Sequence, residues 1–154
     1  MVNRSAEQSF QRGLAALSGG RGREALAMFE AAIEIEKRSG AGRPQARYLS
    51  YYGMGLAIEK KQLNEGIRFC RQALSDEFFN PDLCWNLGRL LLRAGRRREA
   101  HDVLVKGYSL QPGHQGILEE LARMGMRRRP VLGFLPRNNV VNVLLGRITR
   151  PSQS

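Results

Sequence analysis

A recurring spacing of small and apolar residues constrains the fold of this chain more than any other feature of its sequence. In the C-terminal half, steps of 12, 4 and 3 residues connect Gly88, Ala100, Leu104 and Gly107. Near the N-terminus, the same steps connect Gly13, Ala25, Phe29 and Ala32. A partial third copy lies 34 residues before the C-terminal one and consists of Gly66, Cys70 and Ala73. The chain therefore repeats a unit of 34 residues, with one insertion near residues 38–45.

Each unit has the hydrophobic pattern of two helices joined by a turn. Residues 81–94 carry an apolar stripe at helical spacing, made of Leu83, Leu87, Leu90, Leu91 and Ala94. Small residues such as Gly88 allow the two helices of a pair to approach closely. Asn80 followed by Pro81 predicts a helix start, and Gly95 predicts a helix end. The repeat is therefore interpreted as a pair of antiparallel helices.

This helix-turn-helix unit resembles the tetratricopeptide repeat. The copy that matches best does so through Trp85, Leu87, Gly88, Ala100, Leu104 and Pro112. In the middle copy, Met54 stands where a glycine is expected, so either Gly53 or Gly55 takes that place. The resemblance implies an all-α fold, a right-handed superhelix of three helical pairs with a capping helix and a C-terminal helical tail.

The repeat register predicts the domain organisation. We expect one repeat domain over residues 1–126, with units at about 6–39, 46–80 and 81–112 and a cap helix at 114–125. A basic and apolar tail follows over 127–154, with a short helix at about 139–149. Its apolar stripe must be buried, either against the chain itself or in a second copy of the protein, so a homodimer formed through the tail stays open.

Nothing in the sequence indicates a catalytic, metal or cofactor site. His101 and His114 stand at no motif spacing from a nucleophile, and Cys70 and Cys84 lie in apolar helical context. We therefore expect no enzymatic activity, no metal and no cofactor. Because no apolar run approaches the roughly 20 residues of a membrane span, and no signal peptide core is present, we expect a cytoplasmic protein.

In proteins that the repeat resembles, the first helix of each pair lines a concave groove that holds a partner. Carrying those positions over predicts a groove lined by Phe10, Leu14, Tyr52, Leu56, Lys60, Asp82, Trp85, Asn86, Arg89, Arg93 and Arg123. Tyr51 is the alternative to Tyr52. Aromatic and cationic levels alternate, which favours an acidic, partly apolar peptide or helix of another protein. The alternative is that Trp85 only packs against neighbouring helices.

The carboxylate clamp that some relatives of this repeat use is not expected, since Asp82 stands where a basic residue would help. Two other functions stay open. The net charge is +11, and residues 86–154 carry 13 basic and 4 acidic side chains, so the basic half is a candidate for binding nucleic acid, RNA included. The length and repeat number also resemble those of small bacterial secretion chaperones. A membrane partner is not expected.

Overall fold

The structure is a computed structural model that describes residues 3–40 and 42–125. The described residues form seven α-helices and no strand. Their bounds are α1 Arg4–Ser18, α2 Gly22–Arg38, α3 Ala46–Glu59, α4 Leu63–Asp76, α5 Pro81–Arg93, α6 Arg97–Leu110 and α7 Gln115–Arg123. The tail at 127–154 and its expected helix at 139–149 lie outside the described residues.

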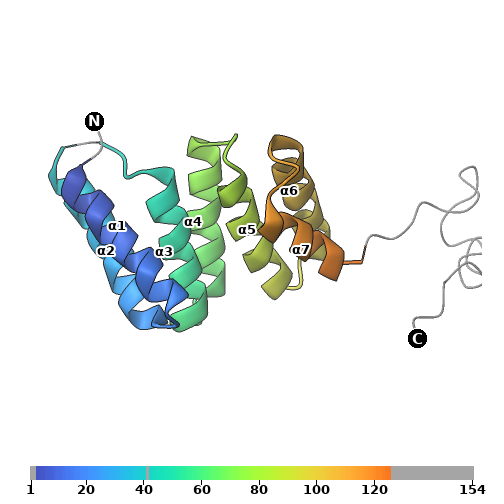
Figure 1. Ribbon diagram of the computed structural model, residues 1–154, viewed down its shortest axis with the longest axis horizontal. Helices are drawn as coiled ribbons and strands as arrows, with labels where there is room; N and C mark the ends of the chain where they lie inside the picture. The colour runs from blue at the N-terminus through green and yellow to red at the C-terminus, as the bar shows by residue number, and fades with distance from the viewer. Residues whose placement is uncertain (1–2, 41, 126–154) are drawn as a thin grey trace, which may run out of the picture. The chain divides into compact units, whose positions relative to one another are not determined.

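The helices stack as three hairpins with one further helix at the end (Figure 1). Helices α1 and α2, α3 and α4, and α5 and α6 are the paired helices, and α2 packs on α3 while α4 packs on α5. Helix α7 packs on α6 and, to a smaller extent, on α5. All seven belong to one compact unit, Met1–Arg123. The fold is therefore an all-α helical repeat.

Glycines stand where the two helices of a hairpin touch. A Cβ atom at Gly13 would lie 2.5 Å from the Phe29 ring, and one at Gly88 would lie 2.6 Å from Leu104 Cδ2. In the middle hairpin, a Cβ at Gly53 would lie 2.7 Å from the carbonyl oxygen of Gly66 in α4. Gly55 faces α2 instead, so Gly53 is the glycine that the repeat pattern requires.

The core follows the stack in two clusters. The first centres on aromatic side chains of hairpins one and two, with Phe10 packed 5.6 Å from Phe29 and 4.8 Å from Tyr48 between ring centroids. The second joins hairpins two and three through aliphatic residues such as Ile67 and Leu90. Burial of these side chains supplies the main stabilisation of the stack.

The connections alternate between two edges of the stack (Figure 1). The short turns within hairpins, at residues 19–21, 60–62 and 94–96, lie at one edge, and the loops between hairpins lie at the other. Two of the short turns use a glycine with positive φ, Gly20 and Gly95 at 73°, while the third uses Lys61 at 59°. Within the described residues, none of the helices has the length and apolar character needed to cross a membrane.

Candidate functional site

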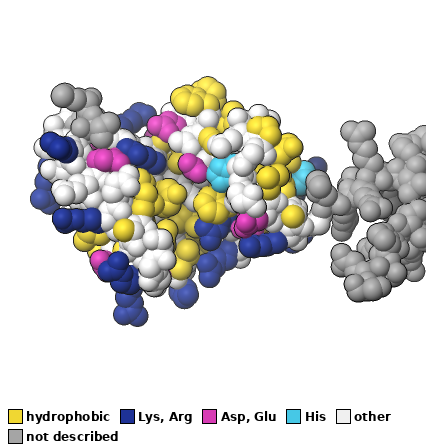
Figure 2. All heavy atoms as spheres, viewed as in Figure 1, with side chains coloured by type: hydrophobic (Ala, Val, Ile, Leu, Met, Phe, Trp, Pro, Cys, Tyr) yellow, Lys and Arg dark blue, Asp and Glu magenta, His cyan; other side chains and the backbone are white. Residues whose placement is uncertain are grey.

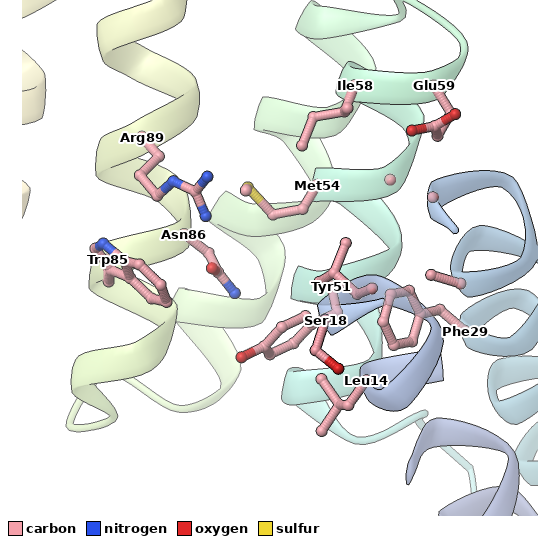
Figure 3. Close-up of a pocket in the computed structure, with 14 residues that line it drawn as sticks. Leu14, Ser18, Phe29, Tyr51, Met54, Ile58, Glu59, Trp85, Asn86 and Arg89 are labelled. Atoms are coloured by element: carbon pink, nitrogen blue, oxygen red, sulfur yellow. The ribbon is translucent and has the colours of Figure 1, made fainter. Parts of the chain in front are cut away.

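A hollow of about 420 Å³ opens between the first helices of the three hairpins. Figure 3 shows Trp85, Asn86 and Arg89 on one side of it and Leu14, Tyr51 and Phe29 on the other. The complete lining is Leu14, Leu17, Ser18, Gly22, Ala25, Phe29, Tyr51, Met54, Gly55, Ile58, Glu59, Trp85, Asn86 and Arg89. We call this hollow the groove.

The floor of the groove is apolar. Phe29 is buried beneath it, and the Tyr51 ring packs 5.5 Å from the Phe29 ring, which fixes its orientation. Burial raises the pKa of Tyr51, the charge of Asp82 raises it further, and the charge of Arg89 lowers it. Because both of these charges belong to α5, the Tyr51 phenol interacts electrostatically with the opposite wall of the groove. Met54 and Ile58 extend the apolar floor along α3.

Helix α5 provides an aromatic and cationic wall. The Arg89 guanidinium lies 5.0 Å from the centroid of the Trp85 ring, within the range of a cation–π contact. Arg89 Nε also lies 3.8 Å from Glu120 Oε1 of α7, and its side chain keeps 39% of its exposure. A pair this long and this exposed contributes little. Arg89 therefore remains able to bind an acidic group in the groove.

Helix α7 holds the far edge of Trp85. A Cβ at Gly116 would collide with the indole ring, so only glycine allows α7 to lie this close. The His114 ring packs 5.5 Å from Trp85, and His114 Nε2 lies 2.9 Å from Asp82 Oδ1. The indole Nε1 is buried without a hydrogen-bond partner among the described residues. The Trp85 side chain of α5 thus packs against α7 on one side and lines the groove on the other.

Asn86 is fixed from beneath. It is buried, and its Nδ2 donates to Ser50 Oγ of α3 at 3.1 Å. The Cys70 thiol of α4 donates to the Ser50 carbonyl oxygen at 3.3 Å, and burial raises the pKa of this thiol to about 12. This hydrogen-bonded chain links three helices below the groove, so the buried Asn86 amide is held in a fixed position beside it.

Of the residues that the sequence predicts for the groove, the structure brings Leu14, Trp85, Asn86 and Arg89 together there. It places three others elsewhere. Phe10 is buried, because Tyr48 and Tyr51 of the next hairpin cover its ring, and Leu56 is also buried in the interior. Tyr52 turns away from the groove and packs 5.2 Å from Phe69 of α4.

The four remaining residues lie outside the groove lining. Lys60 caps the C-terminal end of α3, and Arg93 is exposed at the end of α5. Asp82 lies at the start of α5 and contacts His114. Arg123 is occupied with Glu119 and Glu120 of its own helix. In each case the side chain sits at a helix end or on α7, beyond the lined hollow.

Sequence reasoning missed much of the α3 side of the groove. The residue that follows the hairpin glycine lines the groove in all three first helices, as Leu14, Met54 and Arg89 do. The residue four positions later lines it as well in α1 and α3, as Ser18 and Ile58 do. Choosing Gly53 as the glycine of the middle copy would have identified Met54 and Ile58 from the sequence.

Sulfur, imidazole and carboxylate groups do not converge here. Among the residues that the structure describes, no three His, Cys, Asp or Glu side chains are placed to hold a metal ion.

Glu7, at the start of α1, is an acidic residue that is paired with a basic one, Arg47 of α3. Burial raises its pKa, but hydrogen bonds from Gln11 and Tyr48 and the charge of Arg47 lower it more, so the pKa lies below its usual value.

No family model matches the chain, and no curated protein sequence matches it. Solved structures do match. The TPR domain of Arabidopsis OM64 is 19% identical with a TM-score of 0.64, over 78% of this chain and 93% of that one. The first TPR of Spaghetti (RPAP3), bound to an HSP90 peptide, is 12% identical with a TM-score of 0.66, over 80% and 95%. PcrH in complex with the chaperone binding region of PopB is 16% identical with a TM-score of 0.61, over 80% and 97%.

This protein has the tetratricopeptide repeat fold. The match extends over most of each of these repeat domains and over about four-fifths of this chain. Two of these neighbours carry a segment of another protein. In this chain the groove is lined by Trp85 and Arg89 on its α5 side.

Proposed function

We propose that this TPR domain is a protein-binding adaptor that holds a segment of a partner protein in the groove between α1, α3 and α5. The observation that carries the proposal is the hollow of about 420 Å³ with an apolar floor and an aromatic wall. A hollow of this size and character suits a few large side chains, as in grooves that bind peptides and helices. The neighbours with bound segments support a protein partner.

The charges of the groove define the partner further. Arg89 stands over Trp85 in the α5 wall, and its exposed guanidinium offers hydrogen-bond donors to a carboxylate. Glu59 lies at the far end of the hollow, beside the start of α2. The partner segment therefore presents large apolar side chains to Tyr51 and Met54 and an acidic side chain to Arg89.

A single substitution tests this use of the groove. Leu17 lines the groove, and 41% of it is exposed, so Leu17→Arg places a charge on the apolar lining without disturbing the core. Peptides are selected from a displayed random library on the wild-type protein, and the dissociation constants of the selected peptides are measured by fluorescence anisotropy. We expect the selected peptides to combine large apolar and acidic residues. Leu17→Arg should raise their dissociation constants by about tenfold or more.

Leu110→Arg is the matched control. Leu110 has the same residue type and the same 41% exposure and also lies at the end of a helix, but α6 does not line the groove. It should leave the dissociation constants unchanged. Arg89→Glu should raise the dissociation constants of peptides with acidic residues and leave those of purely apolar peptides unchanged. Equal binding by wild type and Leu17→Arg would overturn the proposal.

A further inference from the structure

Unpaired positive charges gather at one edge of the TPR stack, away from the groove. They are Arg23, Lys60, Lys61, Arg93 and Arg98, all exposed. The charged side chains of these five residues form no hydrogen bond or ion pair with another described residue. They belong to all three hairpins, so the charge is a property of the whole edge and not only of the arginine-rich third repeat.

The stacking of the hairpins brings these residues side by side. The three short turns lie at the same edge of the stack, and Figure 2, in the same view, shows Lys and Arg side chains along it. Contacts between hairpins agree: a Cβ at Gly22 would collide with the Glu59 side chain, and a Cβ at Gly66 would lie 3.3 Å from Leu90 Cδ1. Adjacent packed helices are separated by about 8–10 Å between their axes. We therefore infer that the cations of neighbouring turns form a row with spacings of this order.

The acidic residues of this edge are already engaged. One stands in the first turn of each second helix, and each pairs with an arginine nearby: Glu24 with Arg21 at 3.1 Å, Glu65 with Arg68 at 2.8 Å, and Glu99 with Arg96 at 2.7 Å. Glu59 lies against the start of α2, where the helix dipole favours a negative charge. The five unpaired cations therefore remain as a surplus that local carboxylates do not neutralise.

We propose that this basic edge binds the phosphate backbone of a nucleic acid. A row of cations at repeat spacing matches a chain of phosphates, and such contacts need no base recognition. A protein partner would require apolar anchors as well. Of the large apolar side chains that are exposed in the described residues, only Leu17 lies near this edge, and it faces the groove. The edge and the groove are thus separate surfaces.

To test the edge, one charge is removed in or beside each of the three short turns. The edge variant is Arg23→Gln, Lys60→Gln and Arg98→Gln in the full chain. Binding to a labelled single-stranded RNA of about 20 nucleotides and to a DNA duplex of about 20 base pairs is measured by fluorescence anisotropy between about 50 and 200 mM salt. We expect wild type to bind, and the edge variant to bind at least tenfold more weakly at the lower salt. For RNA, the slope of log K against log salt should fall by roughly two, at about 0.7 for each of three lost contacts.

The control variant removes the same number of charges elsewhere. Arg4, Arg12 and Arg38 are exposed and also have no partner among the described residues, but none lies in a turn of the edge. Their replacement by Gln should leave the salt slope unchanged. Equal losses in both variants would overturn the proposal, because total charge would then suffice. Binding of neither nucleic acid would overturn it too, as would binding only to vesicles with about 30% phosphatidylserine or only to polyglutamate.

Discussion

Phe10 and Trp85 occupy the same place in two different hairpins, three residues before Gly13 and Gly88 respectively, yet they have different surroundings. Phe10 is only 2% exposed, because Tyr48 and Tyr51 of α3 cover it. Trp85 is half-buried and lines the groove, and it contacts Gly116 of α7 and the ring of His114, which precedes α7. The helix that packs next therefore helps to decide whether an aromatic side chain at this position belongs to the core or to the groove.

The middle hairpin supports the same conclusion. Its residue three positions before the glycine is Ser50, which is fully buried and accepts a hydrogen bond from Asn86 of the next hairpin. The three equivalent positions thus hold an aromatic residue in the core (Phe10), a buried residue that is hydrogen-bonded to the next hairpin (Ser50) and an aromatic residue that lines the groove (Trp85). In each case the contacts come in part from the first helix of the following unit: Tyr48 and Tyr51 of α3 for Phe10, Asn86 of α5 for Ser50, and Gly116 of α7 for Trp85.

The largest expected effect separates the two aromatic residues. Phe10→Ala leaves a cavity within a closed aromatic cluster, so it should lower the free energy of unfolding by about 3–5 kcal/mol. Trp85→Ala removes a ring that is only half-buried and should cost less, about 1–2 kcal/mol. Urea unfolding followed by circular dichroism measures both variants. If Trp85→Ala destabilises the protein as much as Phe10→Ala, Trp85 is a core residue like Phe10.

The neighbouring glycines should behave alike at both ends of the molecule. Gly13→Leu and Gly88→Leu each force a side chain into the facing helix, at the Phe29 ring and at Leu104, and each should cost about 1–3 kcal/mol or more. The contact here lies within a hairpin and does not depend on the next unit.

Gly113→Leu serves as the control for these two glycines, since no atom lies within 4 Å of a Cβ at that position. Its unfolding free energy should stay within about 0.5 kcal/mol of wild type. A large difference between Gly13→Leu and Gly88→Leu in the same urea titration would mean that the neighbouring hairpin matters at this position too.

The smallest effect concerns the turns. Lys61 adopts φ of 59°, in the left-handed region, where hairpins one and three use glycine. Because a side chain there costs roughly 1–2 kcal/mol and glycine loses more backbone entropy, Lys61→Gly should raise the unfolding free energy by about 0.5–1 kcal/mol. Lys60→Gly, one residue earlier in the right-handed helical region, should lower it instead. Thermal melts of both variants give the signs, and a loss in Lys61→Gly would contradict this account.

The repeat and the all-α fold follow directly from the amino-acid sequence. The steps between Gly13, Ala25 and Phe29, repeated at Gly88, Ala100 and Leu104, encode the contact between two helices that are joined by a short turn. Such a contact is local along the chain, and it requires the same residue types in every copy. Periodicity therefore predicts it directly. The cap by Asn80, whose side chain accepts from the Asp82 backbone N–H at 3.1 Å, is local in the same way.

Packing between the units selected which of the candidate side chains line the groove and which cations share the basic edge of the stack. Phe10 is covered by Tyr48, and Trp85 is wedged against Gly116, and both contacts join residues of different units more than 30 positions apart. The basic edge likewise exists only because the hairpins stack in the same orientation, which brings Arg23, Lys60 and Arg98 to one side. A repeat pattern describes what all units share. Binding surfaces depend on where neighbouring units differ, and that depends on packing between them.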